Sequence, residues 1–112
     1  MVKLESLKKS NQFRKVLKEK KIHTDYFSIF ASKNFFKPKY KSSLIISFLM
    51  KKKIGNAVKR NKIRRKLKAN VQKLLKKKVA INMDNNYIVF GKSNAYTQKQ
   101  DVLLSLMEKS FS

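Results

Sequence analysis

Apolar residues near the start of the chain recur with the spacing of a helix. Ser10 or Asn11 can cap a helix that runs to about Lys20. The residues that precede it, 1–10, are interpreted as a mobile basic lead-in. The first predicted helix thus spans residues 10 or 11 to about 20. Its apolar positions with helical spacing are Phe13, Val16 and Leu17.

Two strands are predicted after this helix. A polar connection, residues 23–25, leads into residues 26–31, where aromatic and β-branched side chains favour a strand. Residues 34–41 contain the only Pro of the chain and are typical of a flexible hairpin loop, and residues 42–50 follow as a long buried strand. Alternation places Tyr26, Ser28 and Phe30 on one face of the first strand, with Phe27 and Ile29 on the other.

The longest predicted element is a helix from Ala57 to about Lys77. Asn56 precedes it and is a favourable N-cap residue. With about 100° between successive residues, the apolar positions of this helix fall within roughly a quarter of a turn, so one stripe must pack against a sheet. The stripe consists of Ile63, Leu67, Val71 and Leu74.

The rest of this helix is cationic. Arg60 lies close to the edge of the apolar stripe. Because an unpaired buried cation is costly, we expect Arg60 to emerge at the helix N-terminus and to meet an anionic group or a carbonyl there. The stripe is flanked by Lys59, Lys62, Lys66 and Lys73 on one side and by Asn61, Arg64 and Lys68 on the other.

A third strand and a last helix complete the pattern. Residues 84–86 are a turn signal, and residues 87–90 form a short strand that ends at Gly91. The last helix begins near Thr97. The order helix-strand-strand-helix-strand-helix predicts the α+β class, a two-layer α-β sandwich with a sheet of about four strands packed by helices. The apolar face of the last helix consists of Val102, Leu103, Leu106 and Met107.

The composition predicts a single domain, residues 1–112, and excludes several kinds of site. The chain has no Cys, which excludes a disulfide framework, a thiolate metal site and a Cys nucleophile. No stretch approaches the roughly 20 apolar residues of a membrane span, and residues 1–5 lack the apolar block of a secretion signal. We therefore expect a cytoplasmic protein with no membrane partner.

The charge of the chain is strongly positive and unevenly distributed. Lys and Arg number 29 against 6 Asp and Glu, which gives a formal net charge of +23 at pH 7. No acidic residue occurs between Asp25 and Asp84, and half of the positions from Lys51 to Lys78 are Lys or Arg. Such a charge favours a polyanionic partner, with nucleic acid as the first candidate and an anionic membrane surface as the second. A solvated basic face without a specific role is the alternative.

Arginine is concentrated at one place. Only four Arg accompany 25 Lys, and three of them, Arg60, Arg64 and Arg65, fall within six residues. A guanidinium offers a planar fork of donors that can grip a phosphate in two places or stack on a base, whereas Lys supplies a point charge. A helix N-terminus also favours phosphate through its free N–H groups. Residues 51–65 therefore predict a surface for a folded RNA.

Residues that carry most enzymatic chemistry are scarce. His23 is the single histidine, and its position in a polar connection favours an ordinary surface role. The acidic residues are dispersed, and no phosphate-cradling run surrounds Gly55. The sequence therefore predicts neither a catalytic residue nor a metal site in this chain.

Residues 51–65 resemble the signature of the bacterial ribonuclease P protein subunit, in which a Lys-Lys-x-Gly-x-Ala-Val stretch leads into an Arg-Asn-Arg helix. The resemblance extends over nearly the whole chain, although Lys62 replaces the second Arg of Arg-Asn-Arg. It implies that the strand-helix-strand crossover through this helix is left-handed, against the usual rule. The RNA-binding residues predicted from the signature and its charged neighbours are Lys52, Lys53, Asn56, Lys59, Arg60, Asn61, Lys62, Arg64, Arg65 and Lys68.

The resemblance also implies a function. The protein would bind, in a one-to-one complex, a catalytic RNA that removes the 5′ leader of precursor tRNA, so it would be a subunit of an endoribonuclease. The RNA and its Mg²⁺ would perform the hydrolysis. A cleft between the first helix and the sheet would hold the single-stranded leader through stacking and phosphate contacts. The predicted cleft residues are Phe13, Leu17, Tyr26, Ser28 and Phe30.

Alternatives remain for both the residues and the function. Leu17 stands where many relatives have Phe, and Phe30 where many have Tyr, so a stacking surface and a hydroxyl are lost. Core packing is the alternative role of Phe13 and Phe30. A small ribosomal protein fits the size and charge equally well, and a cationic helix on a membrane surface is a third possibility. The signature in residues 51–65 favours the ribonuclease P reading.

Overall fold

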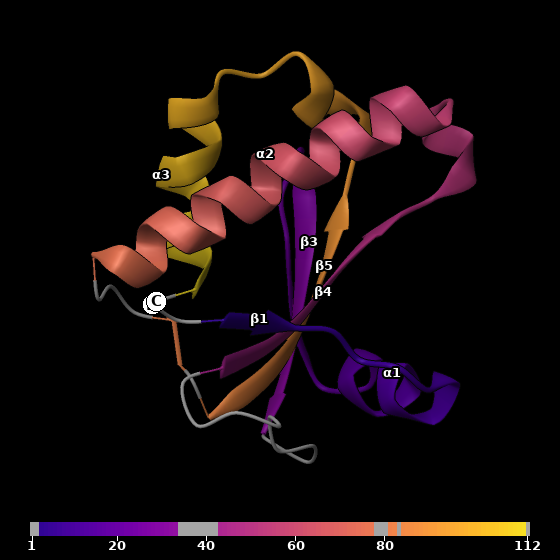
Figure 1. Cartoon of the computed structure of the whole chain (residues 1–112), viewed down its shortest axis with the longest axis vertical. Helices are drawn as coiled ribbons and strands as arrows, with labels where there is room; N and C mark the ends of the chain where they lie inside the picture. Colours follow the sequence, from indigo (N-terminus) through magenta and orange to yellow (C-terminus); the bar gives the residue numbers. More distant parts are fainter. Residues whose placement is uncertain (1–2, 34–42, 78–80, 83, 112) are drawn as a thin grey trace.

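The computed structural model describes residues 3–33, 43–77, 81–82 and 84–111. These residues form one sheet and three α-helices (Figure 1). The predicted hairpin loop at 34–41 lies outside the described residues, as does the first residue of the strand predicted at 42–50. In chain order the elements are β1 (Lys3–Glu5), α1 (Ser10–Leu17), β2 (Lys20–His23), β3 (Phe27–Lys33), β4 (Ser43–Met50), the 3₁₀ turn η1 (Lys52–Ile54), α2 (Ala57–Lys76), β5 (Asn85–Gly91), the 3₁₀ turn η2 (Ser93–Tyr96) and α3 (Gln100–Phe111).

The sheet has five strands in the order β1-β4-β5-β3-β2. Strand β4 runs parallel to both of its neighbours, β1 and β5, while β3 is antiparallel to both β5 and β2. Because β4 and β5 are adjacent and parallel, the chain must cross over between them, and α2 is part of this crossover. The predicted α+β class is confirmed, with one strand more than the approximate number expected.

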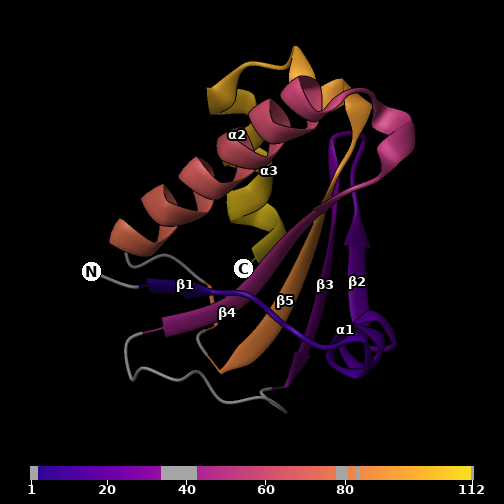
Figure 2. The ribbon, with the colours of Figure 1, turned by 45° about the vertical axis from the view of Figure 1, so that its right-hand side comes forward.

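The larger core lies between one face of the sheet and helices α2 and α3, which Figures 1 and 2 show together on one side. The predicted stripe of α2 is fully buried there, and its four residues are at most 1% exposed. From the sheet, Phe27 and Ile29 of β3 face the same core. In α3 the buried positions are Leu103, Met107 and Phe111, whereas Val102 is 38% exposed. Val102 was therefore assigned to the wrong face of the last helix.

A smaller core lies on the opposite face of the sheet, where α1 packs (Figure 2). Its buried residues are Leu7 and Val16, which lie against Ile45 and Ile88 of the central strands. Helix α1 has only eight residues, so it covers part of this face. The part toward the ends of β4 and β5 is not covered by α1.

The prediction of a mobile lead-in at residues 1–10 is wrong for the described residues 3–10. Residues 3–5 form β1, which pairs with β4 so that Leu4 is opposite Leu44. Leu7 is buried, and its backbone N–H donates to Ser47 Oγ at 2.9 Å. The pairing of so short a strand depends on backbone hydrogen bonds, which leave no periodic pattern of side chains.

The first helix is also shorter than expected. It ends at Leu17 rather than near residue 20, because residues 20–23 form β2 and pair with β3. The sequence placed the end of a helix and the start of a connection here. A strand of four residues that includes two lysines has no clear pattern in the sequence. Because His23 belongs to this strand, it lies on the sheet.

Candidate nucleic-acid interface

The start of α2 is fixed by the two residues that precede it. The Asn56 side chain caps the helix by accepting a hydrogen bond from the backbone N–H of Lys59 at 3.0 Å. Gly55 has φ of 151° and ψ of −161°, a combination that is essentially restricted to glycine. A Cβ atom at Gly55 would also lie 3.0 Å from Lys59 Cδ. The predicted cap is confirmed, and Gly55 is required by the backbone itself.

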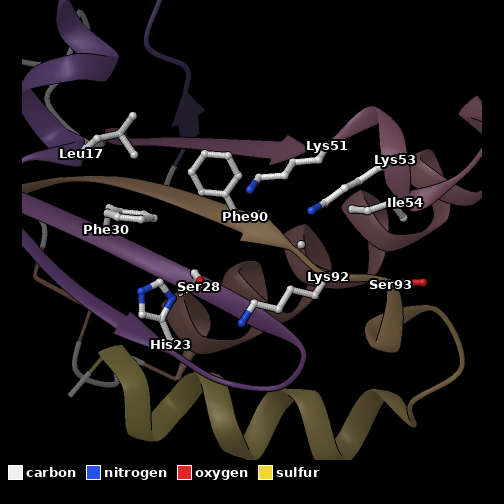
Figure 3. A pocket seen from close by; sticks show the side chains of 11 residues that line it. Leu17, His23, Ser28, Phe30, Lys51, Lys53, Ile54, Phe90, Lys92 and Ser93 are labelled. Atoms are coloured by element: carbon white, nitrogen blue, oxygen red, sulfur yellow. Dashed lines mark hydrogen bonds between the residues drawn. The ribbon is translucent and has the colours of Figure 1, made fainter.

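The chain arrives at this junction through three exposed lysines, Lys51, Lys52 and Lys53. Figure 3 shows the side chains of Lys51 and Lys53 extending in the direction of Phe90, at the end of the sheet. Lys52, the other predicted contact of this cluster, is exposed but does not line the same groove. The lysine cluster therefore faces two surfaces, the start of α2 and the open face of the sheet.

One flank of α2 carries most of the predicted arginine surface. Asn61, Arg65 and Lys68 are exposed, and the half-buried Arg64 donates to Asn61 Oδ1 at 2.8 Å. Val58 is 71% exposed beside them. Together with Val58, three of these residues line a shallow depression of about 380 Å³. An open surface with donors around an apolar centre can accept a large anionic partner. The three lining residues are Asn61, Arg64 and Arg65.

Arg60 lies at the edge between this flank and the core. Its side chain is half-buried, and its buried Nε has no hydrogen-bond partner among the residues that the structure describes. We expected Arg60 to meet an anionic group or a carbonyl. No described residue supplies such an acceptor to its Nε.

The opposite, lysine-rich flank of α2 holds the segment that leads to α3. Lys59 Nζ donates to Ser93 Oγ at 2.8 Å, and the ammonium groups of Lys59 and Lys62 lie 5.3 and 4.8 Å from the centre of the Tyr96 ring. Cation–π contacts at such distances are attractive. Lys59 and Lys62, both predicted to bind RNA, are therefore also engaged within the protein.

Lys66, on the same flank, makes more hydrogen bonds within the protein than Lys59 does. Its ammonium donates to the carbonyl oxygens of Ala95, Tyr96 and Gln98, at 2.9, 3.1 and 2.6 Å. Burial, together with the neighbouring charge of Lys62, lowers the pKa of Lys66 below its ordinary value. Lys66 therefore ties η2 to α2 and is not free to meet a ligand.

A groove of about 650 Å³ lies on the open face of the sheet, beyond the end of α1 (Figure 3). Two phenylalanines line it, Phe30 of β3 and Phe90 of β5, and their ring centres are 5.6 Å apart in an edge-to-face arrangement. Leu17 of α1 forms one wall, and Lys51 and Lys53 lie at the opposite end. Lys92 also lines the groove, and its ammonium donates to the Thr24 carbonyl oxygen. The groove thus combines an apolar surface with lysines, which suits a ligand that combines flat rings with negative charge.

The cleft predicted from sequence is only partly this groove. Leu17, Ser28 and Phe30 line it. Phe13 does not line it and packs against the smaller core, as Leu17 and Phe30 also do. Tyr26 was assigned to the wrong face: it packs against the larger core, and its hydroxyl accepts a hydrogen bond from Gln98 Nε2 at 2.8 Å. The reason is that β3 begins at Phe27, so Tyr26 belongs to the preceding turn and does not follow the alternation.

Of the groove residues that the sequence did not predict, two carry rings, His23 and Phe90. Phe90 was predicted to lie in a strand, but the sequence did not indicate that its ring contacts Phe30. His23 Nδ1 and Ser28 Oγ are 2.6 Å apart, and the ring packs edge-on to Phe30 with 6.0 Å between centres. The assignment of His23 to a polar connection, and hence to an ordinary surface role, missed this setting. Only the pairing of β2 with β3 could have revealed it.

Gly91 joins the groove to α2. A Cβ atom there would collide with Met50 and would lie 2.7 Å from Ile63 Cγ2. The absence of a side chain lets the end of β5 approach α2 closely, and Gly91 itself lines the groove. The groove and the start of α2 are therefore held next to each other by close packing.

Clusters of metal-ligating residues and membrane-spanning helices are both absent from the described residues. Among them, no group of three or more His, Cys, Asp or Glu is arranged to hold a metal, so these residues do not fit a protein-borne Mg²⁺ site. None of the helices found in the described part of the chain is long and apolar enough to cross a membrane.

The fold and the site define a small basic α+β protein in which a cationic helix start lies beside an apolar groove. Comparisons with known proteins give its family: the ribonuclease P family model matches residues 1–112. No curated protein sequence matches the chain. The chain belongs to the family of bacterial ribonuclease P protein subunits, and it is thus a component of an endoribonuclease of tRNA processing. Membership implies association with the ribonuclease P RNA.

Solved structures agree with this assignment. The RNase P protein of Staphylococcus aureus is 25% identical, with a TM-score of 0.68 over 94% of this chain and 90% of that one. The RNase P protein of Thermotoga maritima has a TM-score of 0.73 at 19% identity, over 95% of this chain and 94% of that one. The fold is therefore shared over nearly the whole length of both proteins.

Proposed function

We propose that this chain binds the catalytic RNA of ribonuclease P through the start and the arginine flank of α2, and that it binds the 5′ leader of precursor tRNA in the groove. The observation that carries the proposal is the shared position of Lys51 and Lys53. They belong to the basic junction before α2 and also line the groove. One continuous cationic surface therefore serves two segments of RNA that lie close together.

The α2 surface has the chemistry expected for a folded RNA. The first N–H groups of a helix are free to donate to phosphate, and no acidic residue occurs in the first turn of α2. Arg60, Arg64 and Arg65 add guanidinium forks, which can hold a phosphate through two donors. The exposed Lys52 and Lys68 add charge at the two ends of this surface, and Asn61 adds a neutral polar group.

The groove has the chemistry expected for single-stranded RNA. Stacking of a base on an aromatic side chain contributes about 1–3 kcal/mol, and it requires bases that are not already paired. Phe30 offers such a surface, while Lys51 and Lys53 are placed to meet the phosphates of the same strand. A double helix would keep its bases out of reach, so the groove favours an unpaired leader over the body of a tRNA.

In this proposal the chain contributes binding and orientation. The Mg²⁺ that serves the hydrolysis is held by the RNA and not by a side chain of this chain. We assign no proton transfer or nucleophile to a side chain of this protein. The protein and the catalytic RNA form a one-to-one complex, which acts in the cytoplasm on precursor tRNA.

The test is reconstitution with a bacterial ribonuclease P RNA at low Mg²⁺ concentration. The expected result is that the chain increases cleavage of a precursor tRNA with a leader and leaves product formation dependent on the RNA. A chain that binds the RNA without any effect on cleavage would favour a purely structural role, such as that of a ribosomal protein. Cleavage by the protein alone would overturn the assignment of catalysis to the RNA.

A further inference from the structure

His23 lies at the rim of the groove and is not yet part of the proposed function. It is the single histidine of the sequence, and it belongs to the edge strand β2, where its partner in β3 is Ser28. The imidazole is exposed, whereas Ser28 is only 4% exposed. The ring is therefore available to a bound strand on one side and supported by the sheet on the other.

Two contacts fix the orientation of this ring. One is the hydrogen bond of 2.6 Å between Nδ1 and Ser28 Oγ. The other is the edge-on contact with Phe30, with an angle of 87° between the ring planes. Phe30 in turn contacts Phe90, so three rings form one row across β2, β3 and β5 (Figure 3). A base that stacks on Phe30 would lie beside an imidazole of fixed orientation.

The second nitrogen of the ring, Nε2, is the group that a ligand can meet. It points away from Ser28 (Figure 3), and no hydrogen-bond partner is found for it within the described residues. When a hydroxyl donates to Nδ1, the neutral ring carries its proton on Nε2 and becomes a donor there. The edges of RNA bases offer carbonyl oxygens and ring nitrogens that accept hydrogen bonds.

We propose that His23 is a base-contacting residue of the groove: Ser28 donates to Nδ1, and Nε2–H donates to an acceptor atom of the base that stacks against Phe30. The proposal rests on the proposed function, since it gives His23 a part in leader binding. Lysines that contact phosphates do not distinguish between sequences, whereas a contact to a base edge does. His23 therefore makes the groove selective among leader nucleotides.

The state of the ring can be measured directly, because a single histidine gives a single set of imidazole signals. Long-range ¹H–¹⁵N correlation spectra of the full chain show which nitrogen carries the proton. We expect Nε2 to be protonated in the free protein and its signal to shift when short single-stranded oligoribonucleotides are added. A ring protonated only on Nδ1, or signals that do not move at saturating oligoribonucleotide, would overturn the proposal.

The contribution to selectivity is tested by His23→Phe, which keeps a ring beside Phe30 and removes both nitrogens. The Kd is measured by fluorescence anisotropy for short homo-oligomers of adenosine, cytidine and uridine, and for an abasic oligomer of the same length. We expect the ratio of Kd between the least and the most favoured base to fall about 3- to 10-fold, as the loss of one hydrogen bond predicts, with the abasic Kd unchanged. Ser28→Ala, which frees the ring, is expected to lower the ratio in the same direction.

The outcomes separate this inference from the function on which it rests. If the wild-type chain binds none of the oligomers, the proposed role of the groove itself fails. If it binds them but does not distinguish their bases, or distinguishes them as well after His23→Phe, only the assignment of His23 fails. Equal losses on every oligomer, the abasic one included, would indicate a phosphate contact and would also overturn the proposal.

Discussion

Replacement of Gly55 by Ala tests whether the backbone at this position fixes the start of α2. At φ of 151° and ψ of −161°, a residue with a Cβ atom is strained by about 1–3 kcal/mol. The added Cβ would lie 3.0 Å from Lys59 Cδ, but this side chain can move, so the backbone strain is the larger effect. Since unfolding of a small domain costs about 5–15 kcal/mol, Gly55→Ala is expected to remove a substantial part of the stability.

The assay is thermal and urea unfolding followed by circular dichroism. A loss of about 1–3 kcal/mol in a chain of this size lowers the Tm by about 5–15 °C. Lys52→Ala is the control, because Lys52 is exposed in the same junction and its substitution is expected to stay within about 0.5 kcal/mol. A Gly55→Ala protein as stable as the Lys52→Ala protein would refute the argument from backbone strain.

Four further predictions follow from the site. Gly91→Ala forces β5 away from α2, and we expect a loss of about 1–3 kcal/mol in urea unfolding. Arg64→Ala is expected to weaken binding of the catalytic RNA by about 1–3 kcal/mol in filter binding, whereas Lys73→Ala on the same helix costs much less. Burial lowers the folded-state pKa of Lys66, so ¹³C NMR is expected to show that Lys66 loses its proton below its ordinary value of 10.5. Its contribution to stability therefore increases as pH rises from the folded-state pKa toward 10.5. Sulfate that binds only the folded chain raises the Tm, and a Tm independent of sulfate would contradict the idea that anions relieve its self-repulsion.

The sequence predicts α2 well because two strong signals coincide there. The apolar stripe runs from Ile63 to Leu74, near the end of the helix, and Asn56 is a favourable cap at its start. The observed end at Lys76 therefore differs from the predicted one by a single residue. The resemblance to a known signature adds the family. These are local properties, which a sequence shows directly.

The groove depends on contacts between distant segments, and the sequence shows these poorly. The face on which Tyr26 lies is decided by where β3 begins, and a shift of one residue reverses it. His23 reaches the groove through backbone pairing of a four-residue strand. Likewise, the sequence does not distinguish Lys59 and Lys62 from the other basic side chains of α2. Only the fold shows that both contact Tyr96.

The most direct measurement of the central claim uses the fact that the chain contains no cysteine. A photo-crosslinker attached to a single introduced cysteine reports which RNA lies at that position in the complex of protein, catalytic RNA and precursor tRNA. Ser93→Cys places it at the rim of the groove, and Lys68→Cys places it on the arginine flank of α2. We predict that S93C crosslinks to the 5′ leader and K68C to the catalytic RNA; crosslinks from S93C that never reach the leader, or from K68C that never reach the catalytic RNA, would contradict the account.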